Sequence, residues 1–161
     1  MHTAFVGLGA NLGPAEASVR AAIAALEAVP QSTLVAASRL YRTPAWGRED
    51  QPDFINAVAQ LQTGLAPLAL LDALLGIERA FGRERLSGER WGPRTLDLDL
   101  LLYADQVLDL PRLQVPHPHL HARAFALLPL SELAPEAIIP GHGTVRHALQ
   151  TIDACGLEPI G

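Results

Sequence analysis

The chain has 161 residues, of which 49% are hydrophobic and 18% charged, and its formal net charge is −5. This length favours one domain, residues 1–161, around one core, and argues against a second fused enzyme. The negative charge argues against a general nucleic-acid-binding protein or a protein that binds anionic membranes, so any anion-binding site must be local. The chain has twelve arginines and no lysine, which excludes Schiff-base chemistry and a P-loop lysine.

Two features of the sequence bear on the cell compartment. The N-terminal segment lacks the basic start and apolar centre of a secretion signal, and no run approaches the ~20 apolar residues that span a bilayer. The single cysteine, Cys155, cannot form an internal disulfide and has no neighbouring histidine, so we expect an inert side chain. We therefore expect a cytoplasmic protein.

The first half of the chain is predicted to contain three strands and one helix. Pro14 suits the first position of the helix, and Pro30 ends it. The second and third strands are expected to pair antiparallel, joined over residues 44–53 by a long loop that is suited to function. The elements are a strand over 3–9, a helix over 14–29, and strands over 34–43 and 54–63.

The second half is predicted to begin with a helix over residues 67–81, whose leucines form a broad apolar face. Residues 82–95 contain three glycines, a proline and no periodicity, which predicts an exposed, mobile loop. The elements expected after this loop are a strand over 96–103, a short strand near Val107, a turn at 116–121, and helices near 124–133 and 144–153.

The predicted order of elements indicates the fold class. Strand, helix, strand, strand, helix, strand is the order of a ferredoxin-like α+β sandwich. In that fold the sheet is mainly antiparallel and helices cover one of its faces. The opposite face is then free to hold a functional site.

Residues 96–100, Leu-Asp-Leu-Asp-Leu, carry the sharpest local signal. Strand alternation sends Asp97 and Asp99 to one face and the three leucines to the other. The two acids then stand about 7 Å apart along the strand. At that spacing they could share two Mg²⁺ ions together with phosphate oxygens and water. The alternative is a half-exposed strand whose polar face meets solvent.

Arginines gather immediately before this strand. Guanidinium groups match phosphate oxygens bidentately, so the arginines and the acid pair together indicate a polyphosphate site. The glycine-containing loop could close over a nucleotide and exclude water. The alternative is a solvated charged loop in which Glu84 and Glu89 pair locally with arginines. The clustered residues are Arg79, Arg83, Arg85, Arg90 and Arg94.

The strand over residues 54–63 places Phe54 and Asn56 on one face. Together they offer an aromatic plane and an amide that both donates and accepts hydrogen bonds. This combination suits a flat heterocycle with an aminopyrimidinone edge. A buried phenylalanine beside a satisfied core asparagine is the alternative interpretation.

Two other motifs resemble known sites without fitting them. Residues 7–13 contain three glycines but lack the G-x-G-x-x-G spacing, so we expect these glycines to permit a tight turn from strand to helix. Asn11 is expected to bond locally or to reach into the site. His117, His119 and His121 alternate like metal ligands, but a proline interrupts them, and we expect one histidine to bond a phosphate instead.

Several segments together resemble the 6-hydroxymethyl-7,8-dihydropterin pyrophosphokinase family over nearly the whole chain. The most specific is residues 90–99, Arg-Trp-Gly-Pro-Arg-Thr-Leu-Asp-Leu-Asp. The family's fold is the ferredoxin-like sandwich. The other matching segments are residues 6–13, 38–44, 50–56, 77–78, 82–83, 115–117 and 123–125.

The resemblance implies that a pterin hydroxymethyl oxygen attacks the β-phosphorus of ATP, which transfers pyrophosphate and releases AMP in folate biosynthesis. It implies two Mg²⁺ ions held by Asp97 and Asp99, with Arg83, Arg85 and Arg94 as catalytic residues. It also implies a pterin site and an ATP site. The pterin-binding counterparts are Thr43, Pro44, Ala45, Trp46, Phe54, Asn56 and Phe125, and the ATP-binding counterparts are Glu78, Trp91, Arg94, Leu98, Arg112, His117 and Arg123.

Two other classes of function use the same residues. Another metal-dependent phosphotransferase or phosphohydrolase would use the acid pair on a different substrate and would release ADP or inorganic phosphate. A regulator that binds a nucleotide or a pterin would bind both ligands without turnover. No nucleic acid, membrane or obligate protein partner is expected beside ATP and 6-hydroxymethyl-7,8-dihydropterin.

Overall fold

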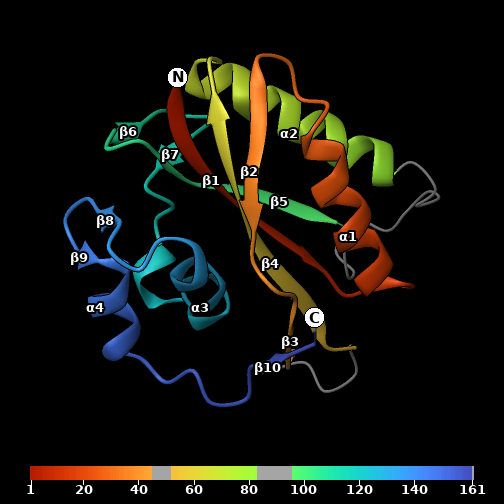
Figure 1. The fold of residues 1–161 in the computed structure, drawn as a ribbon, viewed down its shortest axis with the longest axis vertical. Coiled ribbons are helices and arrows are strands. Elements are labelled where there is room, and N and C mark those ends of the chain that lie inside the picture. Colours follow the sequence, from red (N-terminus) through yellow and green to blue (C-terminus); the bar gives the residue numbers. More distant parts are fainter. Residues whose placement is uncertain (45–51, 83–95, 161) are drawn as a thin grey trace.

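The computed structural model describes residues 1–44, 52–82 and 96–160. Figure 1 shows a twisted sheet with the long helices α1 and α2 against one face and a second group of helices beside the other. The elements are β1 (His2–Ala10), α1 (Ala15–Leu26), β2 (Ser32–Ala37), β3 (Tyr41–Thr43), β4 (Phe54–Thr63), α2 (Pro67–Gly82), β5 (Asp97–Tyr103), β6 (Leu108–Asp109), β7 (Gln114–Val115), the 3₁₀-helix η1 (Leu120–Ala122), α3 (Ala124–Leu133), β8 (Ile138–Ile139), β9 (Gly143–Thr144), α4 (Val145–Gln150) and β10 (Glu158–Pro159).

The main sheet is antiparallel, and β1 lies near its centre. Its strand order is β10-β3-β4-β1-β5, and β2 also pairs with β4. The predicted antiparallel pairing of the second and third strands is confirmed, because both β2 and β3 pair antiparallel with β4. The register sets Gly9 of β1 opposite Asn56 of β4 on one side and opposite Asp97 of β5 on the other.

Strand alternation divides the core into two apolar clusters on opposite faces of the sheet. Ala4 and Val6 belong to the cluster with α1 and α2, whereas Phe5 belongs to the cluster with α3 and α4. The prediction that helices cover one face of the sheet holds for α1 and α2 only. Helix α3 packs on the other face because Leu127 and Leu130 are fully buried there. Any site on this second face must share it with α3 (Figure 1).

Strand β5 changes its alternation in the middle. Phe5 of β1 faces Leu102 and Val6 faces Leu100, so Leu101 has no partner in the pairing with β1. Leu101 and Leu102 therefore both join the second apolar cluster, whereas Leu100 lies in the first. The extra residue is a β-bulge.

The predicted strand over residues 34–43 is wrong as a continuous element, because it is divided into β2 and β3. The Ser38 side chain lies at the break. Its hydroxyl accepts a hydrogen bond from the Val58 backbone N–H (2.9 Å) and donates one to the Arg39 carbonyl (2.8 Å). A serine hydroxyl that replaces a backbone partner in this way interrupts a regular strand.

Two helices are shorter than their patterns predict. Helix α1 ends at Leu26, because the next three backbone N–H groups bond the carbonyl three residues back rather than four. Pro14 is its N-cap rather than its first helical residue. Helix α4 covers six residues, and the hydroxyl of Thr144 caps it by accepting the His147 N–H (3.0 Å). In the described part of the chain, no helix is long and apolar enough to cross a membrane.

Candidate functional site

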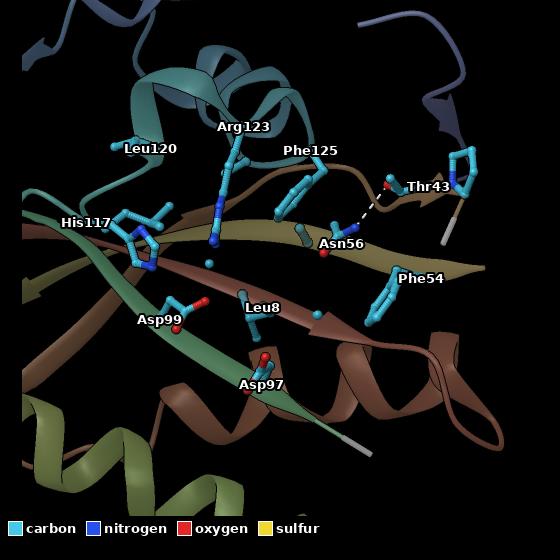
Figure 2. Close-up of a pocket in the computed structure, with 16 residues that line it drawn as sticks. Leu8, Thr43, Phe54, Asn56, Asp97, Asp99, His117, Leu120, Arg123 and Phe125 are labelled. Carbon is cyan, nitrogen blue, oxygen red and sulfur yellow. Dashed lines mark hydrogen bonds between the residues drawn. The ribbon is translucent and has the colours of Figure 1, made fainter. Parts of the chain in front are cut away.

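A cavity of about 500 Å³ opens on the second face of the sheet (Figure 2). Its floor comes from β1, β4 and β5, and α3 with the segment before it forms a wall. The cavity therefore joins segments that are far apart in the sequence. The sequence-predicted site residues that line it are Thr43, Pro44, Phe54, Asn56, Asp97, Asp99, His117, Arg123 and Phe125.

The acidic side of the cavity comes from β5. Asp97 and Asp99 both line the cavity and are partly buried. Leu98 and Leu100 are buried in the apolar cluster of the opposite face. The prediction that alternation places both carboxylates on one face is confirmed. Figure 2 shows both acids rising from β5, with the guanidinium of Arg123 extending toward Asp99 from the other side.

The apolar side of the cavity comes from β4 and α3. The rings of Phe54 and Phe125 lie on either side of Asn56 in Figure 2, and the predicted shared face of Phe54 and Asn56 is confirmed. Asn56 is 8% exposed, and its Nδ2 donates a hydrogen bond to Thr43 Oγ1 at 3.0 Å. Because Nδ2 is engaged by Thr43, Asn56 Oδ1 remains as an acceptor.

The glycines of β1 have a different role from the one predicted. Gly7 and Gly9 are strand residues, and only Gly13 of the motif has the left-handed backbone, with φ of 62°, that a turn requires. A Cβ on Gly9 would lie 2.8 Å from Asn56 Oδ1. The close approach of the Asn56 side chain, on the cavity face of the sheet, therefore explains the glycine at position 9. Asn11 does not line the cavity, and its Nδ2 donates to the Pro52 carbonyl at 3.3 Å.

The basic side of the cavity contains His117 and Arg123. His117 Nδ1 accepts a hydrogen bond from the His119 backbone N–H at 3.3 Å, so the neutral ring carries its proton on Nε2. Burial lowers the pKa of His117 from its ordinary 6.5, and the nearby charges of Arg123 and His119 lower it further. The ring is therefore uncharged at neutral pH and offers an N–H donor.

Several residues predicted by sequence lie outside this cavity. Glu78 Oε2 accepts the Leu98 backbone N–H at 2.6 Å, so these two predicted residues contact each other on the α2 side of β5. Arg112 is exposed and forms an ion pair with Asp72 of α2. The predicted site residues outside the described part of the chain are Ala45, Trp46, Arg83, Arg85, Trp91 and Arg94.

Sequence reasoning missed the lining residues that have no polar side chain. Alternation along β1 from the buried Phe5 could have found the two glycines, because Phe5, Gly7 and Gly9 share one face. No comparable signal marks the other residues. Among them, Leu101 depends on the β5 bulge, and Leu120 and Ala126 depend on the packing of η1 and α3. The missed lining residues are Gly7, Leu8, Gly9, Ala57, Leu101, Leu120 and Ala126.

The histidine-rich turn does not assemble a metal cluster. Across residues 1–44, 52–82 and 96–160, no three His, Cys, Asp or Glu side chains form a group that could hold a metal ion. His121 instead stacks on His142, with ring centroids 3.8 Å apart. Asp97 and Asp99 are two oxygen donors on one cavity, a set that suits Mg²⁺ with phosphate and water better than a transition metal.

Comparison with known proteins gives a consistent result. The family model described as 7,8-dihydro-6-hydroxymethylpterin-pyrophosphokinase matches residues 5–135. A relative from Pseudomonas aeruginosa named 2-amino-4-hydroxy-6-hydroxymethyldihydropteridine pyrophosphokinase is 51% identical over 97% of this chain and 93% of its own length. A relative of the same name from Methylorubrum extorquens is 44% identical over 99% of both chains.

Two solved structures with the same fold belong to larger proteins. The HPPK-DHPS protein of Plasmodium falciparum matches with a TM-score of 0.73 at 16% identity, over 93% of this chain and 44% of its own. Another HPPK-DHPS structure, solved in complex with substrates, matches with a TM-score of 0.71 at 12% identity, and this chain spans 43% of it. At these identities the likeness shows the fold alone.

The close contact at Gly9 predicts a specific cost of adding a methyl group. Gly9→Ala should lower the free energy of unfolding by about 1–3 kcal/mol, the usual cost of overpacking, because Asn56 can move away only by losing its bond to Thr43. Gly7→Ala is the matched control, since the nearest atoms to its Cβ would belong to the Leu101 side chain, at 3.4 Å, an ordinary contact distance. It should stay within about 1 kcal/mol of wild type. Urea unfolding measures both, and equal stabilities would contradict the assignment.

The lowered pKa of His117 predicts a pH dependence of stability. Below pH 6.5 the unfolded chain binds a proton at this residue before the folded chain does. The stability that neutral His117 contributes is therefore complete above pH 6.5 and is lost as pH falls toward the folded-state pKa. The difference in unfolding free energy between wild type and His117→Gln should shrink across this window. His147→Gln, at an exposed position, is the control; parallel curves for wild type and His117→Gln would refute the prediction.

Proposed function

The chain belongs to the 7,8-dihydro-6-hydroxymethylpterin-pyrophosphokinase family, and from this we propose that it transfers pyrophosphate from ATP to 6-hydroxymethyl-7,8-dihydropterin. The products are AMP and the pterin diphosphate, in a step of folate biosynthesis. One observation carries the proposal: a single cavity has an aromatic and amide end and an acidic and basic end on the same sheet face. A flat heterocycle and a polyphosphate need these two environments side by side.

The pterin is assigned to the end formed by Phe54, Phe125 and Asn56. Two aromatic rings can sandwich a planar bicyclic ring, and stacking favours offset parallel arrangements. Asn56 Oδ1 would accept an N–H of the pterin edge, while Thr43 holds the amide in place. Backbone groups of Pro44, Ala45 and Trp46 are proposed from the family resemblance to complete the polar edge.

The triphosphate is assigned to the end formed by Asp97, Asp99, His117 and Arg123. Arg123 supplies a fixed positive charge, and His117 supplies an N–H donor without a second charge at neutral pH. Asp97 and Asp99 would hold two Mg²⁺ ions, which when bound neutralise negative charge on the phosphate oxygens. The partly buried position of both acids in one cavity supports this assignment.

The proposed reaction forms one bond and breaks one. The hydroxymethyl oxygen of the pterin bonds to the β-phosphorus, and the bond from that phosphorus to the oxygen bridging the α-phosphorus breaks. The bridging oxygen leaves with AMP, and the hydroxyl proton passes to solvent. Phosphoryl transfer of this kind depends chiefly on positioning and charge neutralisation, so we assign no protein general base.

The remaining assignments rest on the family resemblance. Arg83, Arg85 and Arg94 are proposed as the catalytic arginines that neutralise charge in the transition state. Glu78, Trp91 and Leu98 are proposed to contact the nucleotide, together with Arg112. The bond between Glu78 and the Leu98 backbone, next to Asp97 and Asp99 on β5, supports a common role for these two residues.

We also propose that the fold is a ferredoxin-like sandwich with additions. Strands β5, β1, β4 and β2 are neighbours in that order, and α1 and α2 each connect two of them. This matches the pattern of the split βαβ arrangement. The short strand β3 and the elements after β5 are then additions, of which β3, η1 and α3 contribute residues to the cavity.

The decisive test is the product of one incubation. Purified protein with Mg-ATP and 6-hydroxymethyl-7,8-dihydropterin should release AMP in a ratio of one to one with pterin diphosphate, measured by ion-exchange chromatography. Release of ADP or inorganic phosphate would favour the rival phosphotransferase or phosphohydrolase. Binding of both ligands without turnover would favour a regulator.

The acid pair predicts a strong and local effect on the rate. Asp97→Asn and Asp99→Asn should each lower kcat by about 10²–10³-fold, the range that loss of one preorganised electrostatic group costs. Asp105→Asn, at an exposed residue in the turn after β5, is the matched control and should keep wild-type kcat. AMP release at fixed Mg²⁺ measures all three. Wild-type rates for either pocket variant would overturn the metal assignment.

A further inference from the structure

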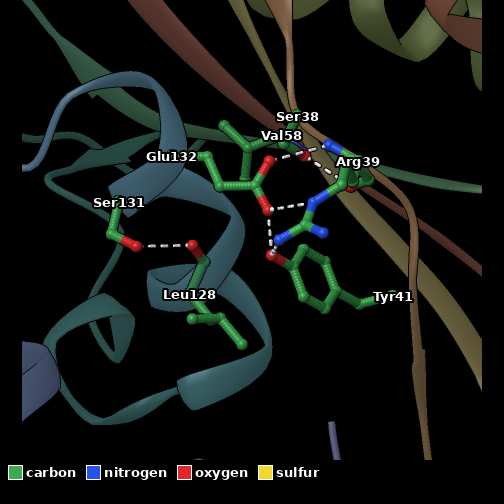
Figure 3. Close-up of polar contacts among 7 residues, drawn as sticks. All are labelled: Ser38, Arg39, Tyr41, Val58, Leu128, Ser131 and Glu132. Carbon is green, nitrogen blue, oxygen red and sulfur yellow. Dashed lines mark hydrogen bonds and ion pairs between the residues drawn. The ribbon is translucent and has the colours of Figure 1, made fainter. Parts of the chain in front are cut away.

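Glu132 near the end of α3 ties this helix to the segment that joins β2 and β3 (Figure 3). Its Oε1 accepts the Arg39 backbone N–H at 2.9 Å. Its Oε2 accepts the Arg39 Nε–H at 3.2 Å and the Tyr41 hydroxyl. These three residues, the Glu132 cluster, join parts of the chain that are more than ninety positions apart.

The two halves of the Glu132 cluster differ in burial. The Arg39 side chain is 57% exposed, and an ion pair at such a position contributes little. Tyr41 is 2% exposed, and the Glu132 side chain is 23% exposed. A hydrogen bond from a buried hydroxyl to a carboxylate is charge-assisted and directional. The Tyr41–Glu132 bond is therefore the main contact of the cluster.

Both ends of this bond share an element with the cavity. On β3, Tyr41 and Thr43 are two residues apart and lie on one side of the strand, and Tyr41 is opposite Asn56 in the register. On α3, Phe125 and Glu132 are seven residues apart, which is close to two turns, so they share one side of the helix. The bond thus joins the helix that carries Phe125 to the strand that carries Thr43 and pairs with β4.

We propose that Tyr41 and Glu132 are positioning residues that hold α3 at the height above the sheet that fits a planar bicyclic ligand between Phe54 and Phe125. The remaining contact of α3 with the sheet is apolar packing around Val58, Leu127 and Leu130, which is not directional. A ring between two aromatic faces needs a gap of about 7 Å, twice the contact distance between carbons. A directional bond can set such a gap. This proposal rests on the proposed function for the identity of the ligand.

The test uses conservative variants of the whole chain. Tyr41→Phe removes only the hydroxyl, and Glu132→Gln replaces one acceptor oxygen with a donor that faces other donors. Glu136→Gln is the matched control, because Glu136 lies just after α3 and pairs with Arg146 at 2.5 Å on the exposed surface. The double variant tests whether the two changes remove the same bond. Thermal unfolding checks that each variant is folded.

Two measurements test whether these variants move Phe125 and weaken pterin binding. Wild-type protein made with 4-fluorophenylalanine has four ¹⁹F resonances, one for each phenylalanine, and Phe125→Leu identifies that of Phe125. The Tyr41→Phe variant has a fifth resonance, from position 41, whose fluorine cannot donate a hydrogen bond to Glu132. Tyr41→Phe and Glu132→Gln should each shift or broaden the Phe125 resonance, whereas Glu136→Gln should not. Titration with 6-hydroxymethyl-7,8-dihydropterin should show the Kd for the pterin raised about fivefold to tenfold, because displacing Phe125 weakens stacking on one side of the ring. The KM for ATP should rise by a smaller factor, because Arg123 at the N-cap of α3 moves with Phe125 whereas Asp97, Asp99 and His117 do not lie on this helix.

The outcomes separate this proposal from the proposed function. The effects of the two variants should not add in the double variant, since both remove one bond. An unmoved Phe125 resonance, or pterin Kd within twofold of wild type in both variants, would overturn the proposal even if their melting temperatures fell. Failure of the wild type to release AMP would overturn the proposed function instead, and the fluorine spectra would still decide whether the cluster positions Phe125.

Discussion

The register of β1 between β4 and β5 is the constraint on which the site depends. It sets Gly9 opposite Asn56 on one side and Asp97 on the other, so one strand separates the amide from the acids. Two interstrand spacings amount to roughly 10 Å, which fixes the reach from the heterocycle end to the phosphate end. A slip of one residue would turn every one of these side chains to the opposite face.

Charges of opposite sign lie on opposite sides of the cavity, and like charges are kept from close contact. Asp97 and Asp99 rise from one edge of the floor, and Arg123 approaches from the opposite wall. His117 stands near Arg123, and a second positive charge there would be repelled; burial and this neighbour keep its ring neutral. The site therefore offers the N–H donor of neutral His117, whereas a protonated ring at this position would be destabilised by burial and by Arg123.

Local alternation predicted the faces of Asp97, Asp99, Phe54 and Asn56, because each stands on a strand whose apolar partners face the core. It could not predict the division of residues 34–43, since a serine hydroxyl replaces a backbone partner there. Nor could it predict the roles of Gly9 or Glu132. Those depend on neighbours supplied by other strands and by a segment more than ninety residues away.

Helix α3 supplies a wall that the sheet alone cannot give to a planar ligand. A sheet offers a planar ligand one wall, and stacking on both sides needs a second. Helix α3 supplies that wall with Phe125, while Arg123 at its N-cap faces the acidic edge, its Cζ 5.6 Å from the Phe125 ring centroid. One helix thus serves both ends of the cavity. Any contact that shifts α3 must change heterocycle binding and phosphate binding together, unless it tilts the helix about one end.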